Sequence, residues 1–166
     1  MANPINHSNR ILRGYTLIEV VIVIAIIGIL AAMALPSLFG QTTRKQVLDS
    51  MPLAEIAKNG VANYYQKNGE MPANNEAANI PEPKKLVGNF VSAVTVNNGA
   101  VTITFGNSVS SALKGKQLTI RPAYMKDTPI VPISWVCAAR AVPKDMTVAG
   151  TNVTDVPLES IPFKCP

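Results

Sequence analysis

The stretch Gly14-Tyr15-Thr16-Leu17-Ile18-Glu19 is followed by residues 20–35, a run of 16 residues with no charge and no hydrogen-bonding side chain. From residue 15 to residue 39 the segment is 25 residues long. At about 1.5 Å per residue, a helix of that length crosses a hydrocarbon core of roughly 30 Å. Arg10 and Arg13 stand just before it, and no acid precedes Gly14. The positive-inside rule then predicts a transmembrane helix with a cytoplasmic N-terminus and the remaining chain outside.

Glu19 does not fit a plain membrane anchor. A carboxylate inside an apolar helix costs several kcal/mol if it stays charged and unpaired, so ionisable residues in such segments usually have a function. The alternative is a structural carboxylate near the membrane edge. If the chain were cut after Gly14, Tyr15 would carry a new α-amino group near the height of Glu19, and that amine is the kind of cation the carboxylate needs.

The basic leader, residues 14–19 and the apolar run together resemble the processing motif of type IV pilins, whose usual form has Phe at the position of Tyr15. The resemblance is close over residues 10–39 and covers the rest only in plan. It implies that a prepilin peptidase cuts between Gly14 and Tyr15 and methylates the new N-terminus of Tyr15. It also implies that Glu19 pairs with the N-terminal amine of a neighbouring subunit during filament assembly.

Residues 1–14 are polar and are predicted to be a cleaved leader rather than part of the fold. Ordinary secretion is the alternative, because Ala32-Met33-Ala34 has the small-x-small pattern of a signal peptidase site. Two features oppose it: Glu19 interrupts the front of the apolar region, and the helical pattern continues beyond Ala34.

The helix is predicted to continue to residue 67 and to become amphipathic in its second half. Its apolar residues recur at spacings of three and four, which places them on one face: Val47, Met51, Ala54, Ala57, Val61 and Tyr64. Glu55 and Lys58 are expected to pair across the solvent face. Asn68-Gly69 is a stop signal.

Gly28 and Pro36 weaken the first half of this helix. Glycine lowers helix stability by about 1 kcal/mol relative to alanine, and Pro36 removes a backbone donor and strains the preceding turn. We predict that the segment between them loses helical hydrogen bonds when the subunit enters a filament.

Residues 69–88 are expected to form a loop, and the pattern changes to a period of two over residues 89–140. Asn98-Gly99 predicts a two-residue hairpin turn between strands at 90–96 and 101–105. Further alternation at 117–121 and 133–140 predicts an antiparallel sheet of about four strands with one buried face. The fold class is therefore α+β, with a leader (1–14), a transmembrane and filament-core half-helix (15–39) and a head domain (40–166).

Cys137 and Cys165 are the two cysteines of the chain. They are expected on the extracytoplasmic side of the membrane, where oxidation to a disulfide is favoured, and two free thiols are the alternative. The proline-rich tail between them has no sustained hydrophobic period, so it is expected to be ordered only if a link attaches it to the rest of the fold. The resemblance implies the disulfide-bounded region of pilins at 137–165.

The sequence favours a structural role over an enzymatic one. The single histidine, His7, lies in the leader, and no nucleophile motif, phosphate-binding loop, cofactor motif or metal-ligand set appears. The predicted function is a type IV pilus subunit that polymerises into an extracellular filament for adhesion, motility or DNA uptake. Its expected partners are copies of itself, the inner membrane before assembly, the prepilin peptidase and the assembly machinery, with nucleic acid contacting only the finished pilus. The alternatives are a pseudopilin of a type II secretion system, a minor pilin, or a membrane-anchored or secreted binding module.

Overall fold

The computed structural model describes residues 14–163 and 165, without the side chains of residues 34–39. The predicted leader, apart from Gly14, lies outside the described residues. The chain divides into two compact units between Leu38 and Phe39. Its elements are α1 (Leu17–Asn68), the 3-10 turn η1 (Pro83–Lys85), β1 (Val91–Asn97), β2 (Ala100–Phe105), β3 (Gln117–Tyr124), β4 (Ser134–Cys137), β5 (Thr147–Val148) and the 3-10 turn η2 (Leu158–Ser160). The predicted α+β class is confirmed.

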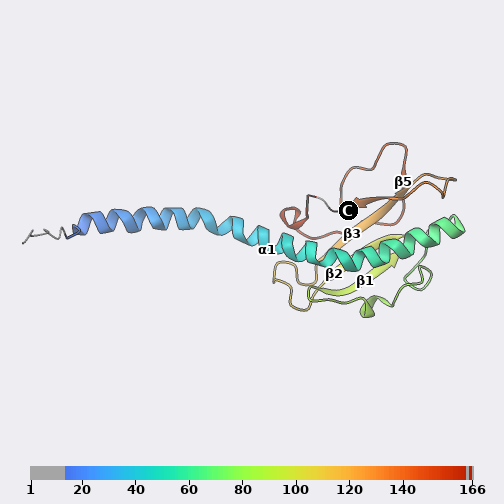
Figure 1. Cartoon of the computed structure of the whole chain (residues 1–166), viewed down its shortest axis with the longest axis horizontal. Helices are drawn as coiled ribbons and strands as arrows, with labels where there is room; N and C mark the ends of the chain where they lie inside the picture. The colour runs from blue at the N-terminus through green and yellow to red at the C-terminus, as the bar shows by residue number, and fades with distance from the viewer. Residues whose placement is uncertain (1–13, 164, 166) are drawn as a thin grey trace, which may run out of the picture. The chain divides into compact units, whose positions relative to one another are not determined.

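The second half of α1 packs across the sheet through one apolar face (Figure 1). Val47, Met51, Ala54, Ala57 and Val61 are buried on this face, as predicted. At its end Tyr65, 2% exposed, takes the core position expected for Tyr64. The helix stops where predicted, because Gly69 adopts a φ of 72° and its N–H binds the carbonyl of Tyr65 at 2.8 Å.

The prediction that Glu55 and Lys58 pair on the solvent face is wrong for Lys58. The pair forms, with Lys58 Nζ 2.6 Å from Glu55 Oε1, but Lys58 is only 5% exposed. Its ammonium lies 5.3 Å from the centroid of the Trp135 ring. The aromatic ring and the carboxylate together compensate the buried charge, which the spacing along the helix could not reveal.

The sheet is antiparallel, with the order β1-β2-β3-β4, and β5 pairs with β3 next to β4. A register shift between Val91 and Ala93 turns Val91 to the same buried face as Val94 and Val96. The predicted hairpin is confirmed: Asn97 pairs with Ala100, and Asn98 and Gly99 have φ angles of 46° and 81°.

The C-terminal segment is more regular than its prolines suggested, since it contains β5 and η2. It also covers the outer face of β3, where Thr119 is fully buried. Thr119 N–H binds Thr154 Oγ1 at 2.9 Å, and Val153 N–H binds Thr119 Oγ1 at 3.2 Å. These bonds attach the tail to the sheet through side chains that carry no periodic signal.

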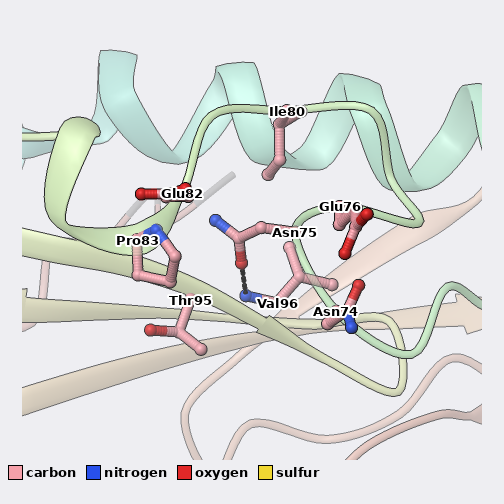
Figure 2. Close-up of a pocket in the computed structure, with 8 residues that line it drawn as sticks. All are labelled: Asn74, Asn75, Glu76, Ile80, Glu82, Pro83, Thr95 and Val96. Carbon is pink, nitrogen blue, oxygen red and sulfur yellow. Dashed lines mark hydrogen bonds between the residues drawn. The ribbon is translucent and has the colours of Figure 1, made fainter.

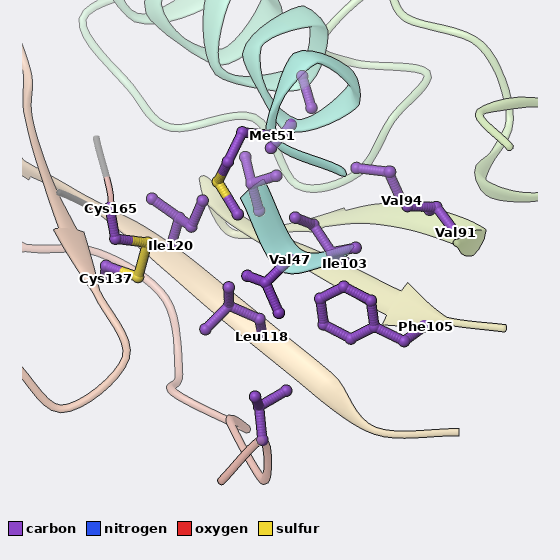
Figure 3. Close-up of a cluster of buried hydrophobic side chains, with 14 of the residues drawn as sticks. Val47, Met51, Val91, Val94, Ile103, Phe105, Leu118, Ile120, Cys137 and Cys165 are labelled. Atoms are coloured by element: carbon purple, nitrogen blue, oxygen red, sulfur yellow. A yellow bond between two sulfur atoms is a disulfide. The ribbon is translucent and has the colours of Figure 1, made fainter. Parts of the chain in front are cut away.

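The core lies between α1 and the sheet, and the disulfide forms one border of it (Figure 3). Its large, fully buried side chains include Tyr65, Phe105, Ile103, Leu113, Leu118 and Ile120. Trp135 packs against this cluster and is partly buried.

Asn75 closes the free edge of β1. Its amide Nδ2 donates to the carbonyls of Pro81 and Val94, both at 2.9 Å, and its Oδ1 accepts from the N–H of Val96 at 2.7 Å. The side chain is 4% exposed. The amide thus satisfies backbone groups that an edge strand would otherwise offer to another chain.

Replacing Asn75 with alanine is expected to lower the free energy of unfolding by about 2–4 kcal/mol, because buried backbone groups lose their partners. Thermal unfolding of the full-length protein in detergent measures the change. Glu76→Ala, an exposed neighbour, is the matched control. Equal stability of the two variants would contradict the role given to Asn75.

Candidate functional site: the N-terminal segment and the disulfide-bounded region

The N-terminal site begins at Gly14, and Thr16 caps the helix that follows. The N–H of Glu19 binds the carbonyl of Thr16 at 3.1 Å and its Oγ1 at 3.3 Å. Glu19 lies in the first turn of α1, where a carboxylate interacts favourably with the helix dipole. Sequence reasoning missed this cap, although Thr16 and Glu19 have the spacing of a capping box.

Tyr15 and Glu19 lie on the same side of the helix start. They line a hollow of about 300 Å³ together with Val20, Val23 and Ile24. The hollow therefore has one carboxylate in an otherwise apolar wall. A group that fills it would need an apolar body and a cation, which a second apolar helix with a free N-terminus provides.

The first half of α1 exposes a long stretch of apolar side chains over residues 17–33. All residues from 14 to 33 are exposed, and the large apolar ones range from 48% to 83% exposure. Within the described part of the chain, no helix combines the length and the apolar character needed to cross a membrane. The structure therefore does not show the transmembrane helix predicted over residues 15–39.

Gly28 and Pro36 both lie inside the continuous helix α1 of the single chain. A Cβ built on Gly28 meets open space, so no contact within the chain requires glycine there. The predicted loss of helix between the two residues concerns a filament, and it stays a prediction.

Cys137 and Cys165 form a disulfide with their Cα atoms 5.9 Å apart. Both cysteines are buried, at 1% and 8% exposure, in the core cluster. Three further bonds attach this region to α1. Arg44 donates from Nε and Nη2 to the carbonyl of Glu159, and Ser160 Oγ donates to Thr43 Oγ1 at 2.8 Å.

Replacing both cysteines with serine is expected to cost roughly 3–4 kcal/mol, the entropy of a loop of this length. Hydrogen exchange should rise at least about tenfold in residues 138–163, because the opening energy falls there first. The β1–β2 hairpin, outside the loop, is the internal control. A uniform rise over both regions would contradict a local role for the disulfide.

At the far end of α1, Tyr65 and Tyr124 stack edge to face, with ring centroids 5.1 Å apart. Tyr65 Oη donates to the carbonyl of Met125 at 3.0 Å. Burial raises the pKa of the Tyr65 hydroxyl, and the nearby charges of Tyr124 and Asp127 raise it further. Tyr65 is thus a neutral structural hydroxyl.

Among residues 14–163 and 165, no group of three or more His, Cys, Asp or Glu is placed to hold a metal ion.

Comparison with known proteins shows similarity over most of the chain. Residues 43–166 match the family described as Pilin (bacterial filament), and residues 12–35 match the prokaryotic N-terminal methylation motif. The chain is 36% identical to a fimbrial protein of Neisseria meningitidis serogroup B, over 95% of each chain. It is 37% identical to the type IV major pilin protein PilE1 of Neisseria gonorrhoeae, over 95% of this chain and 88% of that one. The type IV major fimbrial protein FimA of Dichelobacter nodosus is 32% identical, over 65% of this chain and 79% of that one.

An exposed apolar half-helix that starts with a methylation motif and continues into a helix-on-sheet head defines a class of filament-forming subunits. Within that class, this chain belongs to the pilin family.

Proposed function

We propose that this protein is a structural subunit of a type IV pilus. The observation that carries the proposal is the apolar surface of residues 17–33, which the chain itself leaves uncovered. Burying apolar surface contributes about 25 cal/mol per Å², so this half-helix has a strong drive to find a cover. Copies of the same helix can bury this apolar surface, and in a filament each added copy is buried in the same way.

Processing precedes assembly in this proposal. A prepilin peptidase cuts between Gly14 and Tyr15, and Tyr15 becomes the N-methylated first residue. Until assembly, residues 15–39 hold the chain in the inner membrane, and residues 40–166 form the head outside it. The assembly machinery then transfers the half-helix from lipid to the filament core, and the pilus extends from the cell surface.

Glu19 guides this transfer. Its carboxylate lines the hollow beside Tyr15, so the free amine of a neighbouring copy can neutralise it inside the apolar bundle. An unpaired charge there costs several kcal/mol, which favours the one axial position in which each carboxylate meets an amine.

The role is structural rather than enzymatic. The disulfide-bounded region and the relatives named as major pilins support a pilin over a pseudopilin. The filament's task, whether adhesion, motility or DNA uptake, is carried out by the assembled surface.

The segment between Gly28 and Pro36 is proposed to lose helical hydrogen bonds in the filament, where neighbouring helices shield the freed backbone. A Gly28→Ala, Pro36→Ala double variant is expected to shorten the filament's extension under force. A filament reconstruction with continuous helix from residue 15 to residue 39 would contradict this.

Shearing cells that express the full chain tests the proposed function. The sheared fraction should contain long filaments in which this chain is the dominant protein. A chain that stays with the membrane fraction, or appears as soluble monomer in the medium, would support an anchored or secreted binding module and overturn the proposal.

A further inference from the structure

The disulfide-bounded region presents two large apolar side chains beside two arginines. Phe163 is 91% exposed and Leu158 is 79% exposed. They border a hollow of about 360 Å³ that is also lined by Arg44, Arg140 and Ile161. We call these five residues the basic–apolar surface.

Both arginines of this surface are held in place. Arg44 Nε and Nη2 donate to the carbonyl of Glu159 at 3.2 and 2.9 Å, and Arg140 Nη2 donates to the carbonyl of Pro162. Side chains that are already ordered lose little entropy on binding. The exposed carboxylate of Glu159, next to Leu158 in the sequence, lies outside this surface but lowers the charge of the area to plus one.

A second surface of the head has the opposite character. Glu76, Ile80, Glu82 and Pro83, which we call the acidic pocket, line a hollow of about 500 Å³ beside β1. Figure 2 shows Glu82 and Pro83 on one side of this hollow and Glu76 on the other, with Ile80 reaching toward it from the loop. The buried amide of Asn75 fixes the loop that forms the hollow.

Glu82 has a replaceable partner within the chain. Its Oε2 is 3.4 Å from Lys85 Nζ, and the two side chains are 74% and 69% exposed. An exposed pair of this kind contributes at most about 1 kcal/mol. A guanidinium that arrives with apolar contacts can therefore displace the lysine.

We propose that the basic–apolar surface of one copy docks onto the acidic pocket of a second copy. The proposal rests on the proposed function as a filament subunit. The charges are opposite, each surface includes apolar side chains, and the pocket of about 500 Å³ has room for a phenyl ring such as that of Phe163. The two surfaces lie on different parts of one chain, so the contact is head-to-tail and repeats into a helical array rather than closing as a dimer.

The contact need not be strong alone. Helices bundled in a filament core place neighbouring heads at high effective concentration, where weak contacts are well occupied. Its role is to set the angle between neighbouring heads, which the apolar half-helices leave open once Glu19 has fixed their axial position.

A photo-crosslinking phenylalanine analogue at position 163 of the full chain tests the docking in assembled filaments. Filaments are grown from a mixture of ¹⁵N-labelled and unlabelled copies, irradiated and digested with trypsin. The expected product joins tryptic peptide 145–164 of one copy to peptide 68–84 of another, with mixed isotopes. The same analogue at Ile130, which is 86% exposed in another loop, is the matched control and should not label peptide 68–84.

Filaments that form normally but crosslink position 163 only within one copy, or to another peptide, would overturn the docking and leave the proposed function intact. A chain that forms no filaments would overturn both.

A substitution gives a second readout. Phe163→Ser is expected to lower the amount of filament about tenfold, the effect of losing one apolar anchor worth about 1.4 kcal/mol, while Ile130→Ser leaves it unchanged. Both side chains are exposed, so neither change should affect folding. Equal filament amounts for both variants would argue against the docking.

Discussion

Gly14→Val should leave the chain uncut and abolish filaments. A branched side chain at this position obstructs the peptidase, which must bring its catalytic groups to the bond between Gly14 and Tyr15. A Cβ on Gly14 meets no atom of the chain itself within 4 Å, so the substitution leaves the fold undisturbed. Any effect therefore arises in recognition by the enzyme.

The mass of the purified variant measures the result, because an uncut chain keeps its 14-residue leader. Gly40→Val is the matched control, since a Cβ there also meets open space. That variant should be cut normally. A Gly14→Val chain that still begins at Tyr15 and forms filaments would contradict the assigned cleavage site.

Glu19→Ala is expected to be cut normally and yet to reduce filaments by more than about a hundredfold. Removing one partner of a buried charge pair costs roughly 3–5 kcal/mol, and each 1.4 kcal/mol is a factor of ten in an equilibrium constant. The uncompensated group would be the N-terminal amine of the neighbouring copy, left in an apolar bundle. Immunoblots of sheared filaments measure the loss, and N-terminal sequencing confirms the cut.

A purely structural role for Glu19 has a different signature. Its N–H is capped by Thr16, and its carboxylate interacts with the helix dipole, so helix stability could be its only contribution. Thr16→Ala removes the cap and keeps the carboxylate, whereas Glu19→Gln keeps the shape and removes the charge. We expect Glu19→Gln to lose filaments and Thr16→Ala to keep them; the reverse order would assign Glu19 to helix capping alone.

The elements with strong local signals were predictable from the sequence. The helix end at Gly69 and the hairpin turn at Asn98-Gly99 need positive φ angles, which few residue types adopt. The residue types at these positions were therefore enough to predict both features. The spacing of the apolar residues also predicted the buried face of α1, with one error: Tyr64 was expected in the core, and Tyr65 is buried there. Both positions lie close to the same face, and only the packing against the sheet decides which side chain is buried.

Features that depend on distant contacts were not predictable. Lys58 is buried because Trp135, 77 positions later, covers it. The amide of Asn75 replaces a strand partner only because the loop returns to β1. Within the tail, β5 has two residues and is defined by its pairing with β3. No period or motif encodes such contacts.

At the N-terminal site, the motif led us to propose Gly14, Tyr15 and Glu19 as site residues, and the structure adds the hollow that Tyr15 and Glu19 share. The docking surfaces could not be predicted from the sequence, because Arg44 and Arg140 are 96 positions apart. Only the folded head brings them to one hollow.

The most direct measurement is the N-terminal sequence and mass of the chain recovered from the cell surface. We predict that it begins at Tyr15, carries one N-methyl group and comes from filaments. A chain that begins at Leu35 would show ordinary signal cleavage, which removes the apolar half-helix and makes a filament core impossible. A chain that keeps Met1 would show an unprocessed protein, and either result would contradict the central claim.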